Sequence, residues 1–144
     1  MKRILFVCTG NTCRSPMAEA LLKARNIEGV EVKSAGVYAF PGSEASQHAK
    51  TALREKGIEH SHSASLLNQE LIDWATHILT MTAGHKQIII ENAPQAFDKT
   101  YTLKEFVMET DHDVSDPFGS SLDVYRKTLN ELNELVDKLI DRLT

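Results

Sequence analysis

The sequence predicts an α/β fold: a three-layer sandwich in which helices cover a central four-stranded parallel sheet. Short apolar runs alternate with stretches of helical periodicity, a pattern typical of parallel strands joined by crossover helices. The chain opens with such a unit, because the apolar residues 4–7 are followed by a polar loop and then by a helical pattern from Pro16. The 144 residues contain no internal repeat, linker or low-complexity segment, so we expect a single domain over residues 1–144.

The first half of the chain contains two predicted strands and two predicted helices. The strands are residues 3–7 and 30–34, and the helices are residues 16–25 and 46–56. Pro16 suits the first position of its helix, since its missing N–H would have no partner there. Gly57 can end the second helix, because glycine readily adopts the left-handed conformation found after helices. A loop over residues 38–46 separates these units.

The second half continues the alternation and ends in a polar loop and a long helix. We expect helices at residues 68–75 and 82–91, strands at 77–81 and 100–103, and a helical turn at 103–107. Thr82 can cap its helix. The last helix follows the polar loop 109–119, and Ser120 or Ser121 can cap it. Its apolar residues recur every three or four positions, as in a helix packed on a sheet: Leu122, Tyr125, Leu129, Leu132, Val136, Leu139 and Leu143.

Composition and charge limit the partners and the compartment. The formal net charge of −4 argues against a nucleic-acid binder, which normally has a basic face. No apolar run approaches the roughly 20 residues that cross a bilayer, so no membrane partner is expected. The first residues enter a strand too early for a signal peptide, and we therefore expect a cytoplasmic protein.

Both cysteines, Cys8 and Cys13, lie in one loop. A disulfide framework is therefore absent, which fits a reducing compartment. No cluster of cysteines or histidines supplies the third and fourth ligands that a zinc site needs. The sequence predicts no metal site and no other cofactor.

That loop, residues 8–15, has the features of a site for a tetrahedral anion. It joins a strand end to a helix start, where backbone N–H groups and the helix N-terminus attract negative charge. Arg14 adds a planar fork that can bind two anion oxygens at once. The residues between Cys8 and Arg14 are expected to surround the bound anion: Thr9, Gly10, Asn11, Thr12 and Cys13. In a parallel sheet, ligands bind beyond the carboxyl ends of the strands, which is where Cys8 lies.

Cys8 is the candidate nucleophile. We expect the loop amides, the helix N-terminus and Arg14 to lower the pKa of its thiol and to stabilise the thiolate. A free cysteine at a strand end is more often a small buried apolar residue, but Gly10, Arg14 and Ser15 at these offsets argue against that alternative. Ser15 can donate a hydrogen bond to the sulfur, can cap the helix, or can do both. The loop predicts a phosphatase that works through a phosphocysteine.

The spacing Cys-x5-Arg-Ser, the segment VCTGNTCRSPMAEA and the late Asp116-Pro117-Phe118-Gly119 resemble the low-molecular-weight protein-tyrosine phosphatase family. The resemblance runs nearly end to end. Within the family the chain is most similar to the bacterial branch of protein-arginine phosphatases. It implies the Rossmann-like fold of that family and a cytoplasmic monomer that hydrolyses phosphorylated protein substrates and releases inorganic phosphate.

The resemblance also implies roles for residues outside the loop. Asp116 matches the family's general acid, which protonates the leaving group and later activates water. An Asp-Pro pair alone would indicate only a turn, and Asp111 and Asp113 are local competitors that we expect to be solvated. Cys13 can form a reversible disulfide with Cys8, or can simply be a buried packing residue.

A support network for the loop is implied as well: Asn11, Ser15, Ser34 and His62. The loop is expected to contain many left-handed turns, which asparagine tolerates. His62 is the least distinctive member, because His60 lies two residues away and either can be an ordinary surface residue. The other histidines are expected to be structural or solvated: His48, His77, His85 and His112.

Thr12 and Phe118 bear on the choice of substrate. A phosphotyrosine pocket needs aromatic walls on both faces of the phenyl ring, and here only Phe118 follows the Asp-Pro pair. Tyrosine-specific relatives typically have a larger aliphatic residue where this chain has Thr12. A guanidinium needs acceptors, which the Thr12 hydroxyl and the Asp116 carboxylate supply. We therefore favour phosphoarginine over phosphotyrosine, unless Thr12 merely fills space.

Two rival functions remain to be weighed. Thioredoxin-coupled arsenate reductases have a similar fold and first loop, but they need further cysteines, and none follows Cys13. A non-catalytic oxyanion-binding adaptor would be expected to lose Cys8, Arg14 or Asp116, and all three are present. The sequence thus favours an enzyme.

Overall fold

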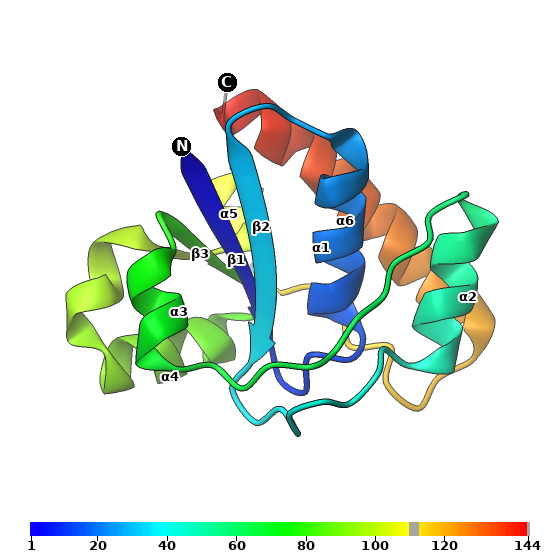
Figure 1. Cartoon of the computed structure of the whole chain (residues 1–144), viewed down its shortest axis with the longest axis horizontal. Helices are drawn as coiled ribbons and strands as arrows, with labels where there is room; N and C mark the ends of the chain where they lie inside the picture. The colour runs from blue at the N-terminus through cyan, green and yellow to red at the C-terminus, as the bar shows by residue number, and fades with distance from the viewer. Residues whose placement is uncertain (110–112, 144) are drawn as a thin grey trace.

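The computed structural model describes residues 1–109 and 113–143 and has the predicted alternation of strands and helices (Figure 1). In chain order the elements are β1 (Lys2–Cys8), α1 (Arg14–Arg25), β2 (Val30–Gly36), α2 (Gln47–Glu55), α3 (Gln69–Trp74), β3 (His77–Thr80), α4 (Ala83–Asn92), the 3-10 helix η1 (Pro94–Lys99), β4 (Thr100–Thr102), α5 (Leu103–Phe106) and α6 (Leu122–Leu143).

The four strands form one parallel sheet in the order β2-β1-β3-β4. β1 lies in the interior of the sheet, and its last residue, Cys8, pairs with Gly36 at the end of β2. Val7 pairs with Thr80, the last residue of β3. The carboxyl ends of these strands therefore meet at one edge, and the loop after Cys8 lies there.

Helices cover both faces of the sheet, as predicted (Figure 1). Successive side chains of a strand point to opposite faces. Ile4 and Phe6 accordingly pack in the core that contains α1 and α6, whereas Leu5 and Val7 pack in the core that contains α3 and α4. All four side chains are fully buried, which explains why this strand reads as an uninterrupted apolar run.

Helix α1 begins two residues earlier than predicted, at Arg14, so that Pro16 is its third residue and not its first. A proline fits there because the N–H groups of the first turn have no partner within the helix. The N-cap residue is Cys13. The alternative role of Ser15 as a helix cap is therefore wrong.

Other boundaries agree to within two residues, and the predicted caps at Thr82 and Ser121 are confirmed. Strand β2 continues to Gly36, two residues past its predicted end. The hydroxyl of Thr82 accepts from the N–H of His85 at the start of α4, and Ser121 accepts from Val124 at the start of α6. The 3-10 helix η1 was not predicted, because its six residues are too few to show a periodic pattern. None of the helices in the described part of the chain is long and apolar enough to cross a membrane.

The segment after α5 returns to the edge where Cys8 lies. The N–H of Val114 donates to the carbonyl of Met81, just beyond β3, at 2.8 Å. This contact places residues 113–118 next to the loop between β1 and α1. The predicted competitor Asp111, together with His112, lies outside the described residues.

Candidate active site

A pocket of about 240 Å³ opens at the carboxyl edge of the sheet. Every residue that lines it was predicted from the sequence as a site residue: Cys8, Thr9, Gly10, Thr12, Cys13, Arg14, Asp116 and Phe118. They come from the loop 8–14, which we call the phosphate loop, and from residues 116–118, which we call the acid loop. The fold thus joins two segments about 100 residues apart in the sequence.

Cys8 is held by hydrogen-bond donors at the base of the phosphate loop. Its Sγ lies 2.8 Å from the Ser15 hydroxyl and accepts from the backbone N–H of Asn11 at 3.3 Å. The Asn11 side chain donates to the same Ser15 oxygen at 2.8 Å. Since that oxygen already accepts one hydrogen bond, the Ser15 proton is free to point at the sulfur.

The protonation of Cys8 differs from the sequence-based expectation. Burial raises the pKa of the Cys8 thiol above its ordinary value, although hydrogen bonds from Ser15 and Asn11 and the charge of Arg14 lower it. The side chain is only 3% exposed, so loss of hydration outweighs the donors. The predicted net lowering of this pKa is therefore wrong, while each named group acts in the predicted direction.

Arg14 links the two halves of the pocket. The Arg14 side chain is 5% exposed, and its Nη1 donates to the carbonyl of Val114 at 2.8 Å. Nη2 lies 3.6 Å from the Asp116 carboxylate. A buried guanidinium that has donors left beside a nucleophilic sulfur can hold a phosphoryl group by its oxygens.

The acid loop is much more exposed than the phosphate loop. The Asp116 side chain is 51% exposed, and its Oδ1 accepts from the N–H of Phe118 at 3.0 Å. Phe118 is 74% exposed at the rim of the pocket. Asp113 does not line the pocket, and it is not merely solvated as expected: its carboxylate accepts from the first N–H of α4, that of Ala83, at 2.8 Å. Of these two carboxylates, only Asp116 lines the pocket that contains Cys8.

Asn11 supports the loop from below and does not line the pocket. Its side chain is fully buried, donates to Ser34 Oγ at 2.9 Å and accepts from the N–H of Ser65 at 2.8 Å. Its φ of 57° lies in the left-handed region, as predicted for an asparagine. Asn11 is the only residue of the stretch 8–15 with a positive φ, so the expectation of many left-handed turns is wrong.

A second layer of polar groups holds Asn11 and Ser34. Ser34 donates to the Glu19 carboxylate at 2.5 Å. His62 Nε2 lies 2.7 Å from the carbonyl of Asn11. The side chains of His60 and His62 are 9% and 5% exposed, so neither is an ordinary surface residue. The predicted network is present, with Glu19 as a member that the sequence did not reveal.

Thr12 and Cys13 occupy the outer part of the phosphate loop. The Thr12 hydroxyl lies 3.8 Å from Cys13 Sγ, and Cys13 Sγ lies 3.2 Å from the Tyr125 hydroxyl. Burial raises the pKa of Tyr125 to about 12, so this hydroxyl stays protonated and can donate to the sulfur. Cys8 and Cys13 are both free thiols.

Two further residues shape the loop and were missed in the sequence. His85 Nε2 lies 2.9 Å from the Thr9 hydroxyl, and the histidine is buried at the start of α4. A side chain on Gly36 would place its Cβ 2.4 Å from the carbonyl oxygen of Thr9, so only glycine fits there. Gly36 ends β2 and His85 follows β3, the two strands that flank β1. Their position at the carboxyl edge of the sheet was the signal available in the sequence.

Comparison with known proteins agrees with this geometry. The family model described as low molecular weight phosphotyrosine protein phosphatase matches residues 3–144. A protein-arginine-phosphatase of Geobacillus stearothermophilus is 62% identical over 141 residues, which cover 98% of this chain and 95% of that protein. A low molecular weight protein-tyrosine-phosphatase, PtpB, of Staphylococcus epidermidis is 35% identical over 95% of this chain and 96% of its own length.

Solved structures extend the likeness to three dimensions. The YwlE arginine phosphatase from Geobacillus stearothermophilus superposes with a TM-score of 0.98 at 61% identity, over 99% of this chain and 93% of that one. A YwlE cysteine-to-serine mutant with a phosphorylated active-site serine superposes with a TM-score of 0.95 at 49% identity, over 98% and 95% of the two chains. Helices on both faces of a parallel sheet, a cysteine-arginine loop at its carboxyl edge and these matches agree. The chain therefore belongs to the low molecular weight phosphotyrosine protein phosphatase family.

Proposed function

We propose that this chain is a protein-arginine phosphatase that acts as a single domain and forms a phosphocysteine on Cys8. The observation that carries the proposal is the position of Cys8 Sγ, 2.8 Å from the Ser15 hydroxyl, in a pocket that also contains Arg14 and Asp116. Nucleophile, anion clamp and general acid are the three parts that a covalent phosphoryl transfer needs.

The first half-reaction breaks the bond between phosphorus and the leaving nitrogen. Once deprotonated, Cys8 attacks phosphorus while Arg14 and the loop N–H groups hold the phosphoryl oxygens. Asp116 gives its proton to the departing guanidine nitrogen, so that a neutral group leaves. The hydrogen bond from Nη1 to Val114 fixes the guanidinium of Arg14 at the pocket wall before substrate arrives.

The second half-reaction breaks the bond between phosphorus and sulfur. Asp116, now a carboxylate, takes a proton from a water molecule that attacks the phosphocysteine. The Ser15 hydroxyl donates to the sulfur as negative charge returns to it, which makes the thiolate a better leaving group. The products are inorganic phosphate and the free enzyme, and no cofactor takes part in either step.

Phosphoarginine is favoured because acceptors lie where its guanidinium would enter. The Thr12 hydroxyl and the Asp116 carboxylate line the pocket, and both can accept from N–H groups. The two arginine phosphatases described above are 62% and 49% identical to this chain, whereas the tyrosine phosphatase PtpB is 35% identical. Phosphotyrosine is the second candidate, because Phe118 at the rim offers one aromatic face and the family model bears that substrate in its description.

Compartment, assembly and redox control belong to the same proposal. We infer a cytoplasmic monomer, in keeping with the two free thiols. Because Cys8 and Cys13 line one pocket, we also infer that oxidation joins them in a reversible disulfide that protects Cys8 from irreversible oxidation.

Two measurements test the proposal. Rapid quenching of turnover with labelled phosphoprotein should yield label on Cys8, bound as a phosphocysteine. The Cys8→Ser protein is the control: any label that it carries should show the chemical stability of a phosphoserine and not that of a phosphocysteine. Side-by-side kinetics should give a higher kcat/KM for a phosphoarginine protein than for the same protein carrying phosphotyrosine. Label that never reaches the sulfur would overturn the mechanism, whereas a preference for phosphotyrosine would overturn only the substrate.

A further inference from the structure

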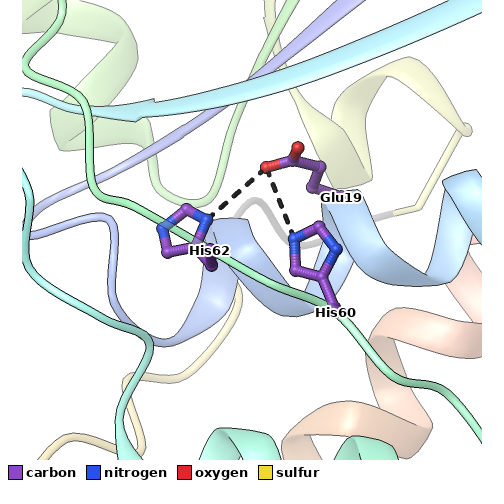
Figure 2. A group of neighbouring side chains, drawn as sticks. All are labelled: Glu19, His60 and His62. Carbon is purple, nitrogen blue, oxygen red and sulfur yellow. Dashed lines mark ion pairs between the residues drawn. The ribbon is translucent and has the colours of Figure 1, made fainter.

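We propose that Glu19, His60 and His62 form a binding site for a divalent transition-metal ion of the zinc type. The site lies beneath the phosphate loop and shares no residue with the pocket. Figure 2 shows the two imidazole rings, which come from the segment between α2 and α3, pointing at the carboxylate that α1 contributes. This proposal does not depend on which phosphoryl group the enzyme removes.

The distances suit a shared ion. His60 Nε2 lies 3.9 Å and His62 Nδ1 lies 3.8 Å from the same oxygen, Glu19 Oε1. One ligand atom from each residue lies within 4.8 Å of the other two. Ligands of a tetrahedral zinc ion at bond lengths of about 2.0–2.1 Å lie roughly 3.3–3.5 Å apart. Small rotations of the side chains would therefore complete the coordination.

The hydrogen bond of His62 sets the ring in the orientation of a metal ligand. Its Nε2 lies 2.7 Å from the carbonyl oxygen of Asn11, which can only accept, so Nε2 carries the proton. Nδ1 is therefore the ring atom available to a metal ion, and it lies 3.8 Å from Glu19 Oε1. Histidines that bind metals typically donate their other N–H to a backbone carbonyl or a carboxylate in this way.

His60 supplies the independent observation. Its side chain is 91% buried, since only 9% is exposed, and Nε2 has no hydrogen-bond partner among the described residues. A buried ring nitrogen without a partner is costly. It lies 3.9 Å from a carboxylate oxygen, an arrangement that a cation between the two atoms would stabilise.

The donor set selects the class of metal. Two imidazole nitrogens and one carboxylate oxygen suit zinc and its neighbours in the first transition row, whereas magnesium and calcium prefer oxygen ligands. Lys23 binds the other oxygen of Glu19 at 2.7 Å, and its side chain is 50% exposed. Lys23 contacts Oε2, whereas Oε1 accepts from the Ser34 hydroxyl and is the oxygen nearest the two rings. A carboxylate oxygen has a second lone pair, which Oε1 can offer to the ion.

An ion here would act on the phosphate loop through two short connections. Glu19 accepts from Ser34, and His62 contacts the carbonyl of Asn11. Asn11 in turn donates to Ser34 through its side chain and to Cys8 through its backbone. The sequence predicted no metal, because Glu19 and His60 lie 41 positions apart and only the fold brings them together.

The test is calorimetric titration of Zn²⁺ into the Cys8→Ser/Cys13→Ser protein, in which no thiol can bind the metal. We expect one Zn²⁺ per chain and a higher Tm in its presence. His60→Asn in the same background should weaken binding at least about 10-fold, since even groups behind the ligands change metal affinity 10–100-fold. The matched control is His48→Asn, a solvent-exposed histidine outside the cluster, which should bind Zn²⁺ like the parent.

Glu19→Gln, which keeps an oxygen acceptor for Ser34, provides a second variant should His60→Asn fold poorly. The absorption spectrum of the parent with Co²⁺ tests the ligand set without any substitution, because four-coordinate Co²⁺ absorbs much more strongly than hydrated Co²⁺. The proposal is overturned if the parent binds no Zn²⁺, as expected for imidazolium rings that merely pair with Glu19. It is also overturned if His60→Asn binds as tightly as His48→Asn.

Discussion

The two walls of the pocket differ sharply in how firmly they are held. On the phosphate-loop side, Asn11 and Ser15 are fully buried, and each makes hydrogen bonds to at least two groups. On the acid-loop side, Asp116 and Phe118 are largely exposed, and the connection to the rest of the pocket is the contact with Arg14. One wall is rigid before substrate arrives, and the other can adjust.

This difference matches the chemistry that each wall is proposed to perform. The phosphoryl group has the same shape whatever protein it comes from, so the donors around it gain most from a fixed arrangement. The leaving group and the polypeptide behind it vary, and an exposed loop can accommodate them. The predictions below test this division, starting with the substitutions of largest expected effect.

Replacing either the proposed nucleophile, Cys8, or the proposed anion clamp, Arg14, should abolish turnover. Cys8→Ser has a hydroxyl in place of the thiol, which is a poorer nucleophile and a much poorer leaving group when the phosphoenzyme is hydrolysed. Arg14→Ala lacks both the anion clamp and the contacts to Val114 and Asp116. Steady-state hydrolysis of an aryl phosphate measures the loss. Appreciable turnover by Cys8→Ser would show that the rigid wall does not carry the nucleophile.

Asp116→Asn should lower kcat on the order of 10²–10⁴-fold, because an amide cannot transfer a proton. The matched control is Asp113→Asn, which changes the same charge three residues away. Its carboxylate caps α4 through Ala83, so this variant should lose some stability and keep its activity. If the two variants were equally impaired, or if Asp116→Asn kept the wild-type rate across pH, Asp116 would not be the acid.

Asn11→Ala should reduce both stability and rate without touching the pocket. The substitution leaves the buried hydrogen-bond partners of the Asn11 amide unpaired, and each unpaired group lowers the free energy of unfolding by about 1–3 kcal/mol. It also places alanine at a φ of 57°. Urea unfolding and kcat measure the two effects. Asn26→Ala is the control, since Asn26 has a φ of 52° at the far end of α1. It should lose stability only, and a matching loss of rate would mean that the network has no special role.

Thr12→Ile should shift substrate preference by about 10-fold, which is typical for a single change in pocket contacts. The isoleucine side chain removes a hydrogen-bond acceptor for the guanidinium of phosphoarginine. It does not change Phe118, on which the phenyl ring of phosphotyrosine would stack. The ratio of kcat/KM values for phosphoarginine and phosphotyrosine substrates measures the shift. Thr12→Ser, which keeps the hydroxyl, serves as control. Equal losses on both substrates would exclude Thr12 as the selector.

The smallest expected effect is on the pH dependence of stability. Burial and the nearby charge of Arg14 lower the pKa of His85 from 6.5 to about 4. Between these values the unfolded chain binds more protons than the folded one, so stability falls as the pH drops from 6.5 toward 4. His85→Gln cannot titrate and should flatten this dependence in urea unfolding.

Local signals explain why most of the site could be predicted. A strand, a polar loop and a helix in direct succession place Cys8 and Arg14 together whatever the rest of the chain does. The Asp116 position needed a family resemblance, because an Asp-Pro pair alone indicates only a turn. Helix caps such as Thr82 and Ser121 were also correct, since capping depends on neighbours three residues apart.

Long-range contacts explain what was missed. Glu19 sits on an ordinary amphipathic helix, and nothing near it in the sequence indicates that it meets His60, His62 and Ser34. His85 looked like any surface histidine until the edge of the sheet placed it against Thr9. The pKa of the Cys8 thiol is raised because burial removes the side chain from water, and the degree of burial is a property of the packed protein.

The sequence by itself determined the alternation of strands and helices, the anion-binding loop and the identity of the groups that can attack, clamp and protonate. These depend on spacing along the chain and on the chemistry of single side chains. Only the tertiary structure decided which carboxylate lines the pocket that contains Cys8, how far burial opposes ionisation of its sulfur and which histidines gather behind the loop. Those outcomes depend on distances and on exclusion of water, and both arise only when segments remote in the sequence pack together.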